Sequence, residues 1–162
     1  MTIWVDADSC PVPVRTMIER FALRLKLPVM FVANRKIPHT LREAKIGAMP
    51  PLFTSIVTES VPDAADDYIV EHAGQDDMAI TRDIPLANRL VERGIAVLND
   101  RGVQWTPENI RERLSERNFN MALVEMGAAP ERTGMYGKRD LNRFANCLDK
   151  TIRQITADGH RG

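Results

Sequence analysis

Residues 2–10 read TIWVDADSC, and this stretch indicates the class of fold. Residues 2–5 form a short apolar run with β-branched and aromatic side chains, which is typical of a buried strand. The run stops at the acidic sequence DAD, residues 6–8. In a parallel α/β sheet, acidic residues at the end of a buried strand lie where ligands bind, at the carboxyl ends of the strands.

The rest of the chain alternates between helical and extended patterns. Residues 12–27 place apolar side chains three and four positions apart, which predicts an amphipathic helix. Residues 60–73 predict another helix, with Ser60 and Asp63 as a capping box and Gly74 as its terminator. Further strands are predicted at residues 29–33, 52–57, 78–81 and 95–98, and further helices at 85–93, from 106 onward, 120–126 and 141–155.

Strands that alternate with helices predict a mainly parallel sheet with helices on both faces. We therefore expect an α/β fold, a three-layer sandwich with a five-stranded sheet and a helical C-terminal third. The length of 162 residues fits a single domain, predicted at residues 1–156. Residues 157–162 are expected to fray.

The composition is that of a globular protein, with 44% hydrophobic and 27% charged residues. The sequence contains no apolar run of membrane-spanning length, and its N-terminus does not resemble a signal peptide. We therefore expect a cytoplasmic location and no membrane partner. Cys10 and Cys147 lack metal-binding spacing and are expected to be reduced thiols. The formal net charge of zero argues against tight binding to polyanions.

Aspartates gather where the predicted strands and helices meet. Six are candidate metal ligands: Asp6, Asp8, Asp63, Asp66, Asp67 and Asp83. The first two follow the first strand and, on an extended chain, point to the same side. The last follows the strand at residues 78–81, and the other three share one face in the first turns of a helix. Like charges at one edge of a sheet repel unless a cation neutralises them, and hard oxygen ligands suit Mg²⁺ or Mn²⁺.

Two other interpretations of these acids stay open. Asp is a favoured N-cap residue, so Asp8 and Asp83 could each start a helix, and Asp63 could stabilise the positive end of another. Asp6 and Asp8 after an apolar strand also satisfy the opening of the haloacid dehalogenase phosphatase signature, with a nucleophile followed by a general acid. That signature continues with Thr or Val, where this chain has Cys10.

Several longer motifs occur together along the chain: WVDADSCPVPVR (4–15), FVAN (31–34), DAADDYIVEHA (63–73), DMAITRDIPLANRLVERG (77–94), LNDRG (98–102) and TPENIRERL (106–114). Over nearly its whole length, the chain resembles the bacterial YaiI/YqxD family. That family is similar in fold to the PIN-like nuclease superfamily, which implies a parallel sheet of order 3-2-1-4-5.

The resemblance to PIN-like nucleases also implies roles for individual residues. Asp6, Asp66 and Asp83 become the expected catalytic acids, with Asp63 or Asp67 as substitutes for the helical acid. Asp8 has its counterpart in the YaiI/YqxD motif. The polar position after the fifth strand is Asn99 or Asp100.

These observations favour a nuclease-type phosphodiesterase that depends on Mg²⁺ or Mn²⁺. Arg82, Asn99, Arg139 and Arg143 are expected to bind substrate, and the last two belong to a predicted basic helix face with Lys150 and Arg153. The expected partner is single-stranded RNA or DNA, bound weakly. Two alternatives are a non-catalytic regulatory protein with a degenerate PIN-like site and a small-molecule phosphatase with an aspartyl nucleophile.

Overall fold

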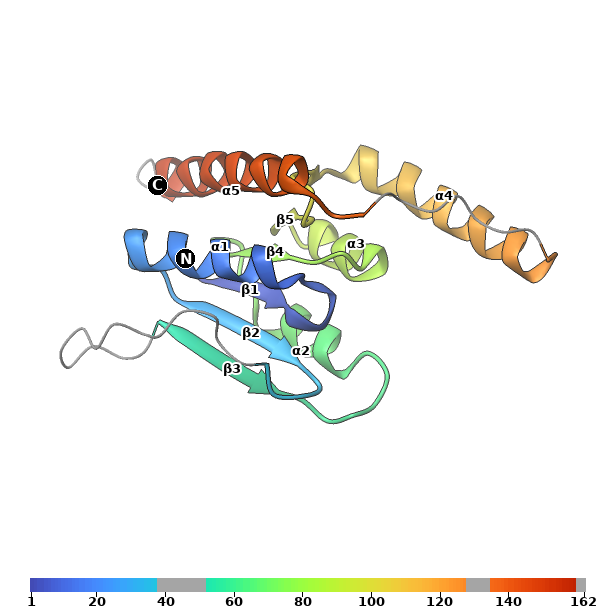
Figure 1. The fold of residues 1–162 in the computed structure, drawn as a ribbon, viewed down its shortest axis with the longest axis horizontal. Helices are drawn as coiled ribbons and strands as arrows, with labels where there is room; N and C mark the ends of the chain where they lie inside the picture. Colours follow the sequence, from blue (N-terminus) through green and yellow to red (C-terminus); the bar gives the residue numbers. More distant parts are fainter. Residues whose placement is uncertain (38–51, 128–134, 160–162) are drawn as a thin grey trace.

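The computed structural model describes residues 1–37, 52–127 and 135–159 (Figure 1). Within these ranges one six-stranded sheet has the order β3-β2-β1-β4-β5-β6. Its strands are β1 (Ile3–Asp6), β2 (Val29–Ala33), β3 (Phe53–Val57), β4 (Met78–Ile80), β5 (Ala96–Leu98) and β6 (Gln104–Trp105). Strands β1 to β5 are parallel, in the predicted order, and β6 is antiparallel to β5. The prediction of five strands is therefore wrong, because it lacks the short edge strand β6.

The helical segments are the 3-10 turn η1 (Ala7–Ser9), α1 (Val12–Leu25), α2 (Ala64–His72), α3 (Ile84–Glu92), α4 (Pro107–Glu125) and α5 (Lys138–Gly159). The predicted capping box is wrong, because α2 begins at Ala64 rather than just after Ser60. The helix predicted at residues 120–126 is the end of α4. Helix α5 continues to Gly159, into the segment expected to fray, and residues 160–162 lie outside the described part.

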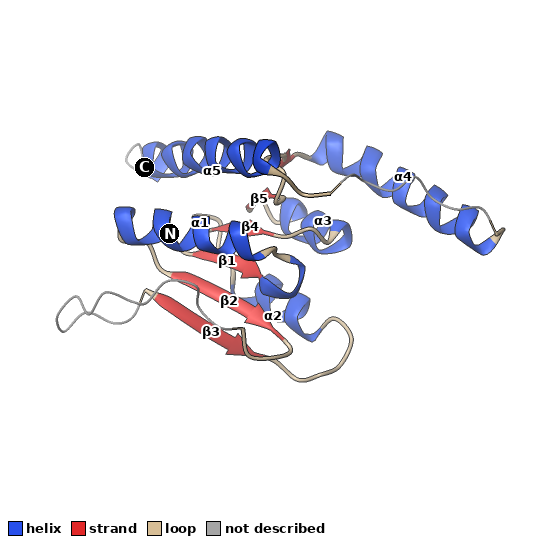
Figure 2. Ribbon diagram, in the orientation of Figure 1, coloured by secondary structure: helices blue, strands red, loops and turns tan. Residues whose placement is uncertain are grey.

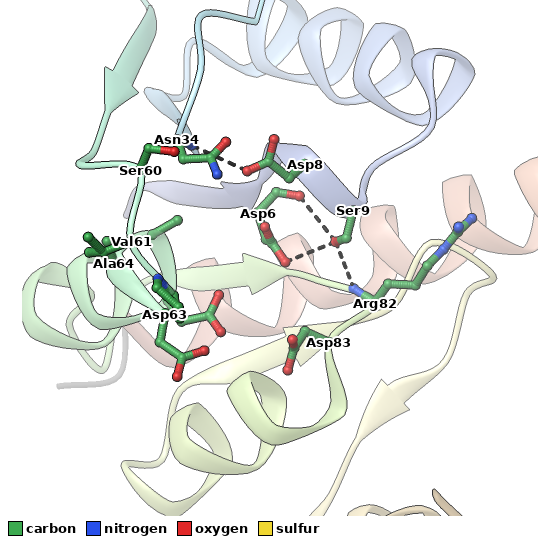
Figure 3. Close-up of a pocket in the computed structure, with 13 residues that line it drawn as sticks. Asp6, Asp8, Ser9, Asn34, Ser60, Val61, Asp63, Ala64, Arg82 and Asp83 are labelled. Atoms are coloured by element: carbon green, nitrogen blue, oxygen red, sulfur yellow. Dashed lines mark hydrogen bonds between the residues drawn. The ribbon is translucent and has the colours of Figure 1, made fainter. Parts of the chain in front are cut away.

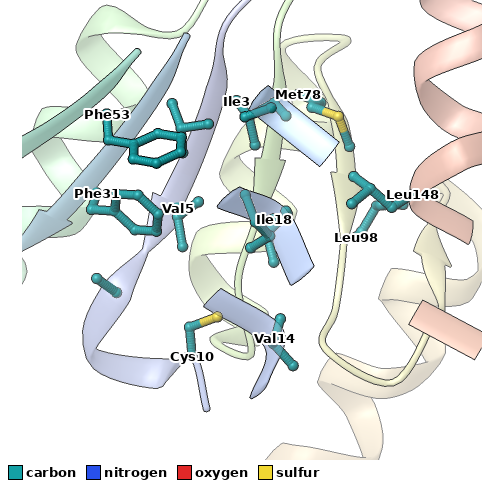
Figure 4. Close-up of a cluster of buried hydrophobic side chains, with 14 of the residues drawn as sticks. Ile3, Val5, Cys10, Val14, Ile18, Phe31, Phe53, Met78, Leu98 and Leu148 are labelled. Atoms are coloured by element: carbon teal, nitrogen blue, oxygen red, sulfur yellow. The ribbon is translucent and has the colours of Figure 1, made fainter. Parts of the chain in front are cut away.

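Helices cover both faces of the sheet (Figure 2). Side chains alternate along β1, so Ile3 and Val5 pack in a cluster with side chains of α1 and α5 (Figure 4), whereas Trp4 packs in a second cluster with side chains of α2 and α3. Phe144 of α5 is fully buried in the first cluster, and Leu86 of α3 is buried in the second. The parallel strands, buried on both faces, account for the apolar runs in the sequence.

Helix α5 packs closely against the turn between β5 and β6. Gly102 in this turn has a φ of +80°, and a Cβ atom at this position would lie 2.5 Å from the backbone carbonyl of Arg143. Only glycine therefore fits both the left-handed conformation and the close approach. Among the described residues, no helix combines the length and apolar character needed to cross a membrane.

Candidate functional site

A cleft of about 630 Å³ lies at the carboxyl ends of β1 and β4 (Figure 3). Its lining includes five of the six predicted aspartates, namely Asp6, Asp8, Asp63, Asp66 and Asp83, together with Ser9, Asn34 and Arg82. Asp67 does not line this cleft. The acids come from the end of β1, the η1 turn that follows it, the start of α2 and the start of α3, as expected for a ligand site at the carboxyl edge of a parallel sheet.

The position of Asp6 follows from the pleat of β1. Asp6 lies two residues after Trp4 and in register with Val32 of β2, and both of these side chains belong to the cluster beneath α2 and α3. Its carboxylate therefore faces the side of the sheet where these two helices begin. Asp6 is only 6% exposed, so the group needs hydrogen-bond donors.

Two hydroxyl groups supply those donors. Ser9 Oγ donates to Asp6 Oδ2 at 2.9 Å, and the buried Thr81 Oγ1 donates to the same oxygen at 2.8 Å. Thr81 Oγ1 in turn accepts from the Asp83 backbone N–H at 2.9 Å, and Ser9 Oγ accepts from the Arg82 N–H at 3.2 Å. These bonds join the ends of β1 and β4 and fix the orientation of Asp6.

Ser9 and Thr81 are not among the site residues predicted from the sequence. The position of each in the sequence could have indicated its role. Ser9 is three residues after Asp6, and Thr81 is the last residue before the Arg82-Asp83 pair. Asn34, at the end of FVAN, was also missed, and its backbone N–H donates to Asp8 Oδ2 at 3.3 Å.

Asp8 lines the cleft, but not because of the side-chain alternation that the sequence predicts for an extended strand. The strand ends at Asp6, and Asp8 lies in the η1 turn, so extended alternation does not apply to it. It is exposed and forms an ion pair with Arg35, with 3.4 Å between Asp8 Oδ1 and Arg35 Nε. Asp8 is therefore a less buried and partly neutralised member of the site.

The three acids near the start of α2 do not share one face, contrary to the prediction. Asp63 is the N-cap residue in a left-handed conformation (φ +62°) without a side-chain capping bond, and Asp66 lies in the first turn. Both line the cleft. Asp67 instead forms an ion pair with Arg89 of α3, at 2.9 Å between Asp67 Oδ1 and Arg89 Nη1.

Asp83 is both a helix N-cap and a residue of the cleft lining. It is the N-cap of α3, where its Oδ1 accepts from the Leu86 N–H at 2.9 Å. The same side chain lines the cleft. The capping bond holds the carboxylate at the positive end of α3.

Burial and mutual repulsion perturb two of these carboxyl groups. The pKa of Asp66 is raised to about 7, first by burial, then by the charges of Asp83, Asp6 and Asp63, with a smaller opposite effect of Arg89. The pKa of Asp6 is also raised, chiefly by burial, although the hydrogen bonds from Thr81 and Ser9 counteract this. A cluster of acids that resists full ionisation is typical of a functional site.

The raised pKa of Asp66 predicts a pH-dependent stability. The unfolded chain ionises this group near its ordinary pKa of 3.8, whereas the folded protein retains the proton up to a pH of about 7. The folded state therefore binds more protons between these values, and stability falls as the pH rises through this window. We expect Asp66→Asn to remove part of this fall, measured as melting temperatures at several pH values in the presence of a chelator. The exposed Asp76→Asn variant is the control, and parallel curves for Asp66→Asn and wild type would contradict the assignment.

The cleft is chemically suited to a hard cation but is not a preformed cage. No group of three His, Cys, Asp or Glu side chains within the described ranges is arranged to hold a metal ion. The donors in the cleft are nevertheless carboxylate and hydroxyl oxygens, which Mg²⁺ and Mn²⁺ prefer. Among the ion pairs of the described residues, none involves Asp6, Asp66 or Asp83. These three acids therefore supply oxygen donors of the kind that a divalent cation binds, although they are not arranged as a preformed site.

The predicted substrate-binding residues are spread more widely. Arg82 lines the cleft, but its guanidinium group turns away from Asp6 (Figure 3) and forms an ion pair with the buried Asp100. Asn99 Oδ1 accepts from the N–H groups of Arg101 and Val103, which closes the turn before β6. The structure does not bring Asn99 into the cleft.

The basic residues of α5 also lie outside the cleft lining. Arg139 and Arg143, with Lys150 and Arg153, are exposed on α5. One of them is partly neutralised, since Arg153 Nε lies 3.1 Å from Asp149 Oδ2. The α5 face is therefore a basic surface separate from the acidic cleft.

The fold and cleft together define a parallel α/β protein with an acidic site at the carboxyl edge of its sheet. Residues 4–154 match the family described as "Uncharacterized BCR, YaiI/YqxD family". The chain belongs to the YaiI/YqxD family.

Similar proteins come from several bacteria. The UPF0178 protein of Treponema denticola is 46% identical over 160 residues, covering 99% of this chain and 97% of that protein. The UPF0178 protein of Treponema pallidum is 47% identical over 155 residues, covering 96% and 83%. That of Syntrophobacter fumaroxidans is 42% identical over 154 residues, covering 94% of both. No solved structure matches the chain significantly.

Proposed function

We propose that the acidic cleft is a Mg²⁺ or Mn²⁺ site that hydrolyses phosphodiester bonds in single-stranded RNA or DNA. One observation carries this proposal: Asp6, Asp66 and Asp83 reach the same cleft from three elements, without an ion-pair partner among the described residues. The similarity of the YaiI/YqxD family to PIN-like nucleases supports it, because that resemblance assigns the catalytic acids to the same three residues.

The residues of the cleft have distinct tasks in this proposal. A bound divalent ion would lower the pKa of a water molecule and stabilise negative charge on the phosphate. Asp6, Asp66 and Asp83 would hold that ion. Ser9 and Thr81 keep Asp6 in one orientation through hydrogen bonds of 2.9 and 2.8 Å. In the absence of metal, burial and the neighbouring acids raise the pKa of Asp66 to about 7, so a cation held by this carboxylate would displace its proton at neutral pH.

The substrate proposal rests on charge outside the cleft. The exposed bases of α5, including Arg139 and Arg143, are suited to phosphate contacts. Arg82 lies on the cleft wall, but its guanidinium group is paired with Asp100. Because the whole chain has no net charge, binding through these residues should be weak and should fall steeply as salt increases.

Metal binding tests the proposal directly. Saturating Mg²⁺ or Mn²⁺ should raise the melting temperature, because an ion that binds only the folded state adds about 2.7 kcal/mol at a hundredfold excess over its Kd. Asp83→Asn should shrink this shift. Asn is also a good N-cap residue, so the variant removes the charge while it keeps the start of α3.

Thermal melting with and without metal provides the measurement, and Asp76→Asn is the matched control, because Asp76 is exposed and does not line the cleft. Melting curves of wild type that do not respond to either metal would contradict the proposal.

The arrangement of the acids favours a second candidate, a non-catalytic binding protein. Because no three potential ligands in the described ranges are preformed for a metal, the cleft could instead bind a cationic group of a partner. This candidate predicts no metal-dependent stabilisation and no hydrolysis. The phosphatase interpretation is less favoured, since Asp6 is 6% exposed and its Oδ2 already accepts two hydrogen bonds.

A further inference from the structure

Among the described side chains of α4, only those in its first half are buried or half-buried. Ile110, in its first turn, is buried with side chains of α3, and the helix then projects beyond the sheet and its covering helices (Figure 1). Side chains at positions 115–122 are all exposed. A single helix of this length is marginal in water, so its outer half is expected to need a packing partner.

The side of α4 that packs on α3 continues into a hollow. This hollow, of about 450 Å³, opens where α3 begins at Ile84. On α4 it is lined by Arg113, Arg117, Met121 and Glu125, which recur every four residues and form one stripe along the helix. Met121 is 49% exposed, a large fraction for a methionine that continues a packed face. Within the described residues, the stripe thus extends the packed face of α4 into an open hollow.

The charges on this stripe identify the partner that fits. Its two arginines are balanced by Glu125 and by Glu116, which also lines the hollow, so it has no net attraction for a polyanion. The charges are instead ordered along the helix. Arg117 lies four residues before Met121, and Glu125 lies four residues after it. A second α4 in antiparallel orientation would place Arg117 beside the partner subunit's Glu125, twice per pair.

We propose that α4 is a homodimerisation surface, with two chains packed antiparallel about a twofold axis near Met121. The two Met121 side chains form the apolar centre, Ile84 borders it, and two Arg117–Glu125 ion pairs flank it. Such an interface is self-complementary, as twofold symmetry requires. The proposal does not depend on the chemistry of the acidic cleft.

Charge reversal with rescue tests the pairing. Sedimentation equilibrium of the full chain should give a mass of twice 18.3 kDa at high concentration. Arg117→Glu and Glu125→Arg should each weaken dimerisation about tenfold, because each turns two attractive pairs into repulsive ones. The double variant should restore the affinity of wild type. Arg117→Glu also replaces a like-charge neighbour of Arg113, so it should not destabilise the helix itself.

Glu112→Arg is the matched control, because the α-helical repeat places residue 112 on the side of α4 opposite Met121. It should leave dimerisation unchanged. A mass of one chain at every concentration would overturn the proposal, and so would equal dimerisation of all variants. If the wild type stays monomeric and Arg117→Glu reduces binding of a single-stranded oligonucleotide instead, the surface is a nucleic-acid site and the dimer proposal is wrong.

Discussion

Under the proposed function, Asp6→Asn is expected to reduce metal-dependent hydrolysis of an oligonucleotide about a thousandfold, because it would remove a charged metal ligand that supplies several kcal/mol to the reaction. The folded protein should keep or gain stability. Burial raises the pKa of Asp6, which means that the fold disfavours its charge, and a neutral Asn removes that penalty. The Asn oxygen can still accept from Ser9 and Thr81.

The rate is measured by single-turnover cleavage with Mn²⁺, and the stability by urea denaturation of the same preparations. Asp76→Asn, an exposed acid outside the cleft, should leave both unchanged. Full activity of Asp6→Asn would exclude Asp6 from catalysis. An unfolded Asp6→Asn protein would show that the carboxylate serves the fold.

Asp77→Ala is expected to destabilise the protein by about 3 kcal/mol, because its carboxylate accepts three hydrogen bonds. They come from the Thr2 N–H at 2.7 Å, the Gly74 N–H at 2.9 Å and Trp4 Nε1 at 3.1 Å. This carboxylate joins the start of β1 to the turn before β4, at the opposite end of the strands from the cleft. The loss should appear as a lower urea midpoint with an unchanged slope.

The neighbouring Asp76 provides the control, since an exposed side chain replaced by Ala should change stability by less than about 0.5 kcal/mol. At temperatures where Asp77→Ala is folded, the stabilisation by Mg²⁺ or Mn²⁺ should persist. An Asp77→Ala protein as stable as wild type would mean that the three bonds exchange with water at no net cost.

The sequence predicts the parallel strands and most helices, because apolar runs mark the strands and apolar residues three and four positions apart mark the helices. The order of the strands came from the family resemblance. Strand β6 was missed because two residues carry no periodic pattern. The start of α2 was misplaced because Ser60 and Asp63 have the spacing of a capping box, whereas Asp63 itself occupies the N-cap in a left-handed conformation. Local chemistry alone does not distinguish these two starts.

The acidic cleft was predictable for a topological reason: adjacent parallel strands bring their carboxyl ends together. Which acids point into it was not. Asp66 and Asp67 are adjacent in the sequence, and only tertiary packing directs the second toward Arg89. The role of Asp77 was not predictable either, because a carboxylate that accepts from Thr2 and Trp4 depends on contacts between segments far apart in the sequence. Whether the cleft binds metal stays a prediction.

The division of the chain around the sheet has a consequence for synthesis. Every residue that lines the acidic cleft lies between Asp6 and Asp83, whereas the core beneath the opposite face is completed by Phe144 and Leu148 of α5. A nascent chain therefore carries all the cleft carboxylates outside the ribosome well before α5 leaves it. Domains generally fold as units, so the cleft should acquire its geometry only when the last helix docks.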